Sequence, residues 1–154
     1  MPGRPPLRLA LLPLVLLAGC TTSAPEATGP VDVPGAAFSD ARVQAACAAL
    51  IEALPDEVDP GVTRRPVSGD ARSTAAWGDP PVTLECGVPE PDRPEEPIFV
   101  NGVQWSVRDI GAGFRWTTRD RAPAVAVDIP SAYENGAEII NPISTTLQQA
   151  VPVR

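Results

Sequence analysis

The stretch Val82-Thr83-Leu84-Glu85-Cys86 alternates apolar and polar side chains. Successive side chains of a β-strand point to opposite faces of the sheet, so Val82, Leu84 and Cys86 would share one face. The stretch therefore predicts a strand that directs the Cys86 thiol into the core. The position of that thiol decides the fold, because a second cysteine lies on a predicted helix.

That helix lies upstream of the strand, where apolar side chains recur at spacings of four, three and four residues. They are Val43, Cys47, Leu50 and Leu54. Asp40 is a good N-cap before them, and Pro55 ends the helix after them. Since Cys47 lies in the apolar stripe, its thiol also points to the core. The two patterns together predict a helix packed on a sheet and joined to it by a Cys47–Cys86 disulfide.

This disulfide would close a loop of about 40 residues and stabilise the fold by roughly 4 kcal/mol through the entropy of the unfolded chain. The alternative is two separate buried thiols. The chain has three cysteines, and the remaining one, Cys20, lies in a different context.

Cys20 ends a segment with the layout of an export signal. A positive start is followed by an apolar run over residues 9–17 and by Leu17-Ala18-Gly19-Cys20. These four residues match the bacterial lipobox, whose cysteine receives a diacylglycerol and becomes the first mature residue. The match implies that residues 1–19 are removed and that Cys20 carries lipid, which anchors a protein stably when two acyl chains are present.

Two alternatives compete with lipidation. The first is a transmembrane anchor, but the apolar run is about half of the roughly 20 residues that a bilayer requires, and Pro13 interrupts it. The second is a conventional signal peptide that leaves a free cysteine. After the signal, residues 20–38 are rich in Pro, Ala, Gly, Ser and Thr, which predicts a flexible tether. Residues 39–154 then form a single globular domain.

The composition excludes several functions. The chain carries 12 basic and 19 acidic residues, a net charge of −7, and it has no histidine. All the basic residues are arginines. Without histidine or lysine, the common nucleophile activation, Schiff-base and P-loop chemistries are absent, and an acidic domain does not bind nucleic acid. We therefore expect no catalytic residue, no cofactor and no metal.

The second half of the chain predicts more strands and a helix. Asn101-Gly102 is a strong hairpin signal between apolar runs, and Gly111 and Gly113 mark another turn. A further strand runs over residues 122–129. Asn141-Pro142 favours the start of a C-terminal helix, with residues 137–140 either extending it or forming a separate piece. The fold class is α+β: a small, mainly antiparallel sheet packed by an N-terminal and a C-terminal helix.

Arginines lie on the sheet face opposite to the predicted core. If Trp105 and Trp116 face the helices, the opposite face carries a basic stripe, which would suit an anionic envelope component or partner. The stripe is made of Arg108, Arg115 and Arg119. The alternative is an ordinary solvated face on which acids such as Asp109 and Asp128 accompany the arginines.

Other candidate sites have weaker signals. Arg64 and Arg65, together with Trp77, form either a binding shelf or a cation–π brace. The acidic residues after the first helix lack the ligand spacing of a calcium loop and predict a solvated turn. Those in the proline-rich loop over residues 88–97 lack the rigid spacing of a glycosidase pair. These acids are Asp56, Glu57 and Asp59 in the first group, and Glu90, Asp92, Glu95 and Glu96 in the second.

The chain resembles a family of lipoproteins from actinobacteria that is classified only as a domain of unknown function. The segments that carry the resemblance are Leu17–Cys20, Cys47–Leu50, Leu54–Pro55, Arg64–Arg65, Ala75–Val88, Asn101–Trp105, Thr117–Thr118 and Val127–Tyr133. The resemblance implies attachment to the outer face of the cell envelope and carries no assigned activity.

Together these features predict a lipid-anchored, extracytoplasmic envelope protein that acts as a binding or accessory module. It would contact the membrane through the lipid on Cys20 and bind an envelope protein or a cell-wall component. The alternative is a carboxylate-dependent hydrolase of cell-wall glycan, which requires two acids in one cleft.

Overall fold

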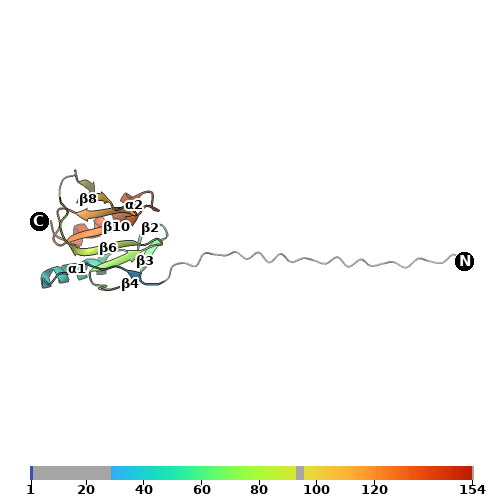
Figure 1. The fold of residues 1–154 in the computed structure, drawn as a ribbon, viewed down its shortest axis with the longest axis horizontal. Helices are drawn as coiled ribbons and strands as arrows, with labels where there is room; N and C mark the ends of the chain where they lie inside the picture. The colour runs from blue at the N-terminus through green and yellow to red at the C-terminus, as the bar shows by residue number, and fades with distance from the viewer. Residues whose placement is uncertain (2–28, 93–95, 154) are drawn as a thin grey trace.

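A computed structural model describes Met1, residues 29–92 and residues 96–153. Its main element is an antiparallel sheet of eight strands in the order β2-β3-β5-β6-β10-β9-β8-β7 (Figure 1). The strands are β2 (Glu57–Asp59), β3 (Val62–Arg65), β5 (Thr74–Trp77), β6 (Val82–Val88), β7 (Ile98–Val100), β8 (Val103–Asp109), β9 (Gly113–Thr118) and β10 (Ala124–Pro130). The central strands β6 and β10 hold the sheet together.

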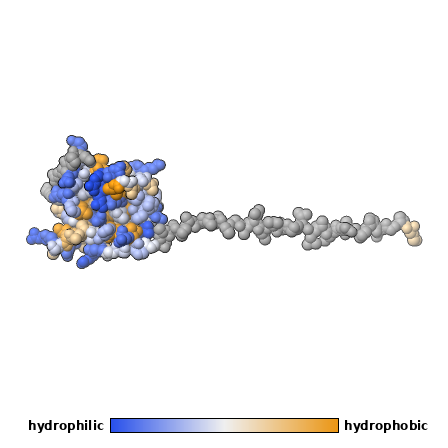
Figure 2. Space-filling model, in the orientation of Figure 1, coloured by the Kyte–Doolittle hydropathy of each residue, from blue (hydrophilic) through white to orange (hydrophobic). Residues whose placement is uncertain are grey.

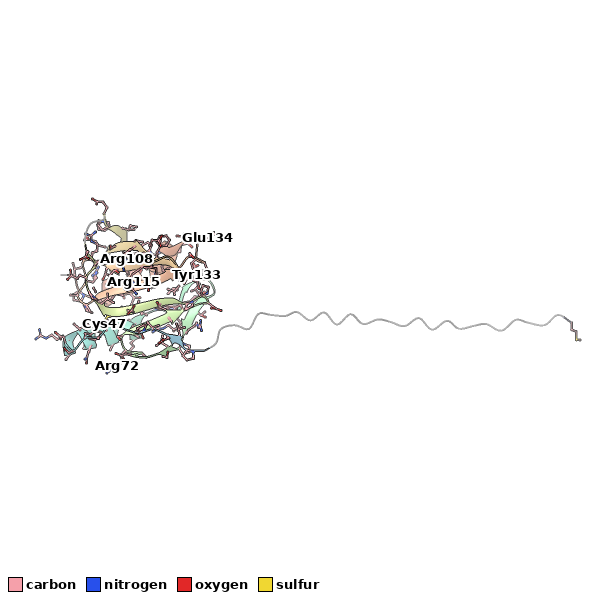
Figure 3. The ribbon with its side chains drawn as sticks, viewed as in Figure 1. Cys47, Arg72, Arg108, Arg115, Tyr133 and Glu134 are labelled. Atoms are coloured by element: carbon pink, nitrogen blue, oxygen red, sulfur yellow. A yellow bond between two sulfur atoms is a disulfide. The ribbon has the colours of Figure 1, made fainter. Side chains whose placement is uncertain are left out.

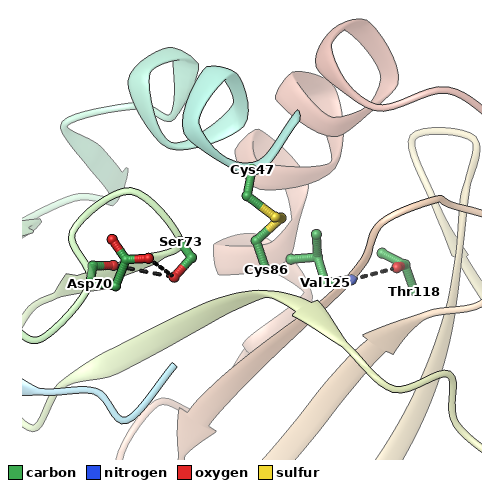
Figure 4. The surroundings of a disulfide bond; sticks show 6 residues. All are labelled: Cys47, Asp70, Ser73, Cys86, Thr118 and Val125. Carbon is green, nitrogen blue, oxygen red and sulfur yellow. Dashed lines mark hydrogen bonds between the residues drawn. A yellow bond between two sulfur atoms is a disulfide. The ribbon is translucent and has the colours of Figure 1, made fainter. Parts of the chain in front are cut away.

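Two helices, α1 (Ala41–Ala53) and α2 (Gly136–Ala150), cover the same face of this sheet (Figure 4). Asp40 caps α1 by accepting a hydrogen bond from the Arg42 N–H at 2.7 Å. Cys47 on α1 and Cys86 on β6 form a disulfide with their Cα atoms 5.6 Å apart. The predicted fold class and the predicted helix-to-strand disulfide are confirmed.

The core fills the space between the helices and the sheet. Cys47, Leu84 and Cys86 are fully buried there, as the alternation of β6 and the stripe of α1 predict. The indole N–H of Trp105 donates to Ser144 Oγ at 3.0 Å, and this pair is also fully buried. This hydrogen bond joins strand β8 to helix α2 and gives both buried polar groups a partner.

The chain begins its fold earlier than the sequence predicts. A two-residue strand, β1 (Val31–Asp32), pairs in parallel with β4 (Val67–Ser68) on the helix-free face. Val31 and Val33 pack there against Ala76 and are 8% and 1% exposed. The predicted tether over residues 20–38 is therefore wrong for its last part, because two alternating valines are too short a signal to stand out from a proline-rich segment.

One further element differs from the prediction, and the open start of the C-terminal helix is decided. The acids after α1 do not form a simple solvated turn but belong to the β2–β3 hairpin, in which Glu57 Oε1 accepts a hydrogen bond from the Gly61 N–H. The helix α2 begins at Gly136, so the first of the two predicted alternatives holds: residues 137–140 extend the helix, and Pro142 lies inside it. Proline lacks an N–H and removes one helical hydrogen bond. The buried face of α2 offsets that loss, since Ile139, Ile140 and Ile143 all enter the core.

Candidate functional site

The helix-free face carries a groove with a volume of about 530 Å³. Its floor crosses four strands in register, from Glu85 on β6 through Ala126 and Thr117 to Ser106 on β8. Three of these four side chains are small, so the floor is shallow between taller neighbours. Arg115 and Arg108 form one wall, and Ala36 and residues 88–92 border the rest.

Arg115 is held in place by two carboxylates. Its Nε donates to Asp128 Oδ1 at 2.6 Å and its Nη2 donates to Asp128 Oδ2 at 2.8 Å. The same Nη2 also donates to Glu85 Oε1 at 2.8 Å. Hydrogen bonding to Asp128 raises the pKa of Arg115 against the opposing effect of burial, and the charges of both acids add to the rise. This network ties β6, β10 and β9 together across the face.

Arg108 lies directly opposite Arg115 in the β8–β9 register, and its side chain is exposed. Among the described residues, its guanidinium has no hydrogen-bond or ion-pair partner. Like charges that face each other across strands destabilise a sheet, and the two carboxylates on Arg115 offset this repulsion. In the part of the chain that the structure describes, the groove therefore presents one guanidinium without a partner beside one that two carboxylates hold. In Figure 2, strongly hydrophilic atoms gather in the part of the surface where Figure 3 labels Arg108 and Arg115.

The predicted arginine stripe is therefore only partly assembled. Arg108 and Arg115 line the groove, whereas Arg119 does not. The Arg119 backbone N–H donates to the Gln104 carbonyl at 2.9 Å, beyond the end of β9, and Arg119 is half-buried with interactions of its own. The accompanying acid Asp128 pairs with Arg115, as the alternative interpretation of an ordinary strand face foresees.

Arg64 and Trp77 form a brace rather than a binding shelf. Trp77 is fully buried and donates from its indole N–H to the Pro55 carbonyl at 2.9 Å. The Arg64 guanidinium lies 5.1 Å from the centre of the Trp77 ring and donates to the Ile51 carbonyl at 3.3 Å. Burial lowers the pKa of Arg64, and the charge of Asp56 acts in the opposite direction. The buried Trp77 ring offers no surface to a ligand, and Arg64 is half-buried against it.

Arg65 points to the opposite face, because it is the next residue of the same strand. Its Nη1 donates to the Gly78 carbonyl at 3.0 Å and its Nη2 donates to the Gly29 carbonyl at 2.8 Å. Nη1 also lies 4.0 Å from the carboxylate of Asp79. Arg65 therefore fastens the N-terminal segment to the turn between β5 and β6.

That turn contains the Trp-Gly-Asp-Pro-Pro motif, whose role here is structural. Gly78 has φ +66°, and a Cβ added to it would lie 2.4 Å from the Tyr133 hydroxyl and 2.9 Å from Val62. The Tyr133 hydroxyl donates to the Pro80 carbonyl at 2.8 Å. Burial raises the pKa of Tyr133, and the charge of Asp79 adds to the rise. Only glycine allows the turn and the tyrosine to approach so closely.

The acids show no arrangement typical of a metal site. Within residues 29–92 and 96–153, no group of three or more potential metal-ligating side chains comes together. Glu90 and Asp92 border the groove, and Glu85 and Asp128 share Arg115. Sequence reasoning alone assigns no role to Glu85, although the alternation of β6 places its side chain on the face opposite to the core.

The predicted lipidation and disulfide residues have different outcomes. Cys20 and the predicted signal over residues 1–19 lie outside the described residues, apart from Met1. Cys47 and Cys86 form the structural disulfide. In the described part of the chain, no helix is long and apolar enough to cross a bilayer.

Comparisons with known proteins give one match. The profile of the family described as "Protein of unknown function (DUF3515)" matches residues 6–154. No curated protein and no solved structure matches the chain. Because the match spans nearly the whole sequence, the chain belongs to the DUF3515 family.

Proposed function

We propose that this protein is a lipid-anchored, extracytoplasmic module of the actinobacterial cell envelope, and that its groove binds an anionic group of an envelope component. One observation carries the binding proposal: Arg108 is unpaired among the described residues and stands beside Arg115, which two carboxylates immobilise. Asp128 and Glu85 neutralise Arg115, so Arg108 is the group that can pair with an oxyanion, and the fixed strand beside it limits the ordering that binding requires.

The location rests on residues 1–20. The signal-like segment and the Leu-Ala-Gly-Cys sequence support lipid attachment at Cys20. Labelling growing cells with a radioactive or alkyne-bearing fatty acid tests this directly. The wild-type protein takes up label and sediments with membranes, whereas Cys20→Ser loses both. Label that persists in Cys20→Ser would contradict the anchor.

The binding role is tested on the full chain in detergent micelles. The probe is a soluble cell-wall fragment that carries free carboxylates, compared with the same fragment after amidation. We expect the acidic fragment alone to bind, and Arg108→Gln to weaken it about tenfold, which corresponds to one charge-assisted contact. Arg42→Gln removes the same charge from the exposed start of α1 and serves as the matched control. Equal loss in both variants would show only a general charge effect.

A second candidate function is favoured by a separate observation. Glu85 and Asp128 both lie within hydrogen-bond distance of the Arg115 guanidinium, so two carboxylates meet at one site, as a hydrolase of wall glycan requires. Both carboxylates accept hydrogen bonds from the Arg115 guanidinium, however, whereas a general acid must be free to donate a proton to the substrate. We therefore expect no release of reducing ends from wall glycan by the purified protein. Release that Glu85→Gln abolishes would favour the hydrolase.

A further inference from the structure

A second depression lies at one end of the sheet and shares no lining residue with the groove. Its volume is about 450 Å³. Three connections form it: the β5–β6 turn, the β8–β9 turn and the segment from β10 to α2. Its lining is largely apolar and includes Pro80, Pro81, Ile110, Ala112, Ile129 and Pro130. We refer to it as the end pocket.

Large apolar side chains remain exposed at this end. Ile110 lines the end pocket and is 40% exposed, and Phe114, which pairs with the lining residue Ile129, is 47% exposed. Exposed apolar surface that surrounds a concavity is typical of an interaction site. The three prolines of the lining restrict the backbone around it, so a ligand finds the pocket largely formed.

Exposed acids are neighbours of the lining residues on all three connections. Asp79 precedes Pro80, Asp109 precedes Ile110, and Glu134 follows two residues after Ala132. Figure 3 shows Glu134 beside Tyr133, whose hydroxyl binds the Pro80 carbonyl.

The lining residue Asp128 is paired with Arg115, and Asp79 lies 4.0 Å from the Arg65 guanidinium, whereas Asp109 and Glu134 have no ion-pair partner among the described residues. The uncompensated charge around the end pocket is therefore negative. Such a rim repels anionic lipid headgroups and attracts cationic protein segments.

We propose that the end pocket docks a partner protein through a large apolar side chain that is flanked by arginine or lysine residues. The apolar side chain fills the pocket, and the flanking cations face Asp109 and Glu134. This interaction extends the accessory role proposed above but uses a surface separate from the groove. The two proposals can therefore fail independently.

The test uses the full-length chain in zwitterionic detergent and three fluorescent peptides of equal length. One has a central tryptophan flanked by arginines, one has the same tryptophan flanked by glutamates, and one has a central glycine flanked by arginines. Fluorescence anisotropy, corrected for protein-free micelles, measures binding. We expect the first peptide to bind at least about tenfold more tightly than either of the others, since both the buried side chain and the charges contribute.

Variants then locate the binding site. Ile110→Ser weakens the first peptide about tenfold by removing apolar contact area. The double variant Asp109→Asn, Glu134→Gln weakens it severalfold and reduces its salt dependence. The asparagine side chain keeps an oxygen for the hydrogen bond that Asp109 accepts from Gly111, so the turn is preserved. Phe99→Ser removes an apolar residue of β7 that is even more exposed than Ile110 and does not line the pocket, and it leaves affinity unchanged.

Four results would overturn the proposal. The first is equal binding of the glutamate-flanked or glycine peptide, and the second is unchanged affinity in Ile110→Ser with a normal unfolding temperature. The third is a loss in Arg108→Gln as large as that in Ile110→Ser, because it would place the peptide in the groove. The fourth is dimerisation in sedimentation experiments that Ile110→Ser abolishes, since a second copy would then be the occupant.

Discussion

The two faces of the sheet use arginine in opposite ways. On the helix-covered face, Arg64 lies over the buried Trp77 ring, and burial lowers its pKa. On the helix-free face, Arg115 is held by two carboxylates, which raise its pKa. The covered face is thus stabilised mainly by apolar packing, which also accommodates the Arg64 charge. The open face is stabilised by ion pairs between Arg115 and the two carboxylates. Changes to the covered face should therefore cost more free energy of unfolding.

The largest expected effect concerns the disulfide on the covered face. Replacing both Cys47 and Cys86 by serine should lower the free energy of unfolding by roughly 4 kcal/mol, because the unfolded chain loses its cross-link. Urea unfolding monitored by tryptophan fluorescence measures the change. Cys20→Ser is the matched control and should leave stability unchanged. A loss below about 1 kcal/mol would show that the covered face does not depend on the cross-link.

The second effect isolates a polar contact on the same face. Trp105→Phe removes the indole donor that Ser144 accepts in the core, which should cost about 2 kcal/mol. Trp116→Phe is the matched control: among the described residues its indole N–H has no hydrogen-bond acceptor, so it should cost less. Thermal unfolding of both variants gives the comparison. Equal costs would mean that ring volume, not the hydrogen bond, sets the stability here.

The third effect concerns the open face. Asp128→Asn removes the charge of one of the two carboxylates that bind Arg115. It should lower the free energy of unfolding by about 1 kcal/mol, because the ion pair is partly exposed to solvent. The cost should shrink in about 1 M salt, which screens partly exposed charges. Arg108→Gln, on the facing strand, should change stability by less than about 0.5 kcal/mol. A cost of Asp128→Asn that is independent of salt would contradict an electrostatic origin.

The smallest effect lies where the turns of the sheet meet α2. Tyr133 is the only tyrosine in the chain, so its ionisation can be followed by ultraviolet absorbance. Its raised pKa in the folded state means that folding favours the neutral phenol. Stability is therefore full below the ordinary tyrosine pKa of about 10 and falls as pH rises through the folded value. Tyr133→Phe should remove this alkaline loss, and a midpoint at or below the ordinary value would contradict the burial of the phenol.

The covered face can be predicted from the sequence because its residues repeat with a clear period. Val82, Leu84 and Cys86 alternate, and Cys47 lies in a helical stripe. Strand β5 escapes prediction because all four of its residues are buried, some under α1 and others under the N-terminal valines, so no alternation is visible. The sequence leaves the start of α2 open between two alternatives because Pro142 is typical of the first turn of a helix rather than its interior.

The groove is harder to predict from the sequence than the covered face, because the local sequence does not determine which strands pair with each other. Alternation places Arg108 and Arg115 on one face, as the structure has them. The role of Glu85 depends on β6 lying next to β10 and β10 next to β9, which brings residues 85, 115 and 128 together. The sequence leaves Trp77 open between a binding shelf and a brace, because a tryptophan near two arginines has the same local pattern whether it is buried or exposed, and the structure has the brace.

The disulfide has a mechanical consequence for any chain held at its N-terminal end. Tension on such a chain enters the domain at Gly29, where Arg65 grips the backbone, and next loads the short β1–β4 pairing. If these contacts yield, the chain peels away up to Cys47 and stops there, because the cross-link transfers the load to β6 in the middle of the sheet. The domain can thus lengthen under force while the groove strands keep their register. The disulfide therefore also limits how far the chain can unfold from its N-terminal side.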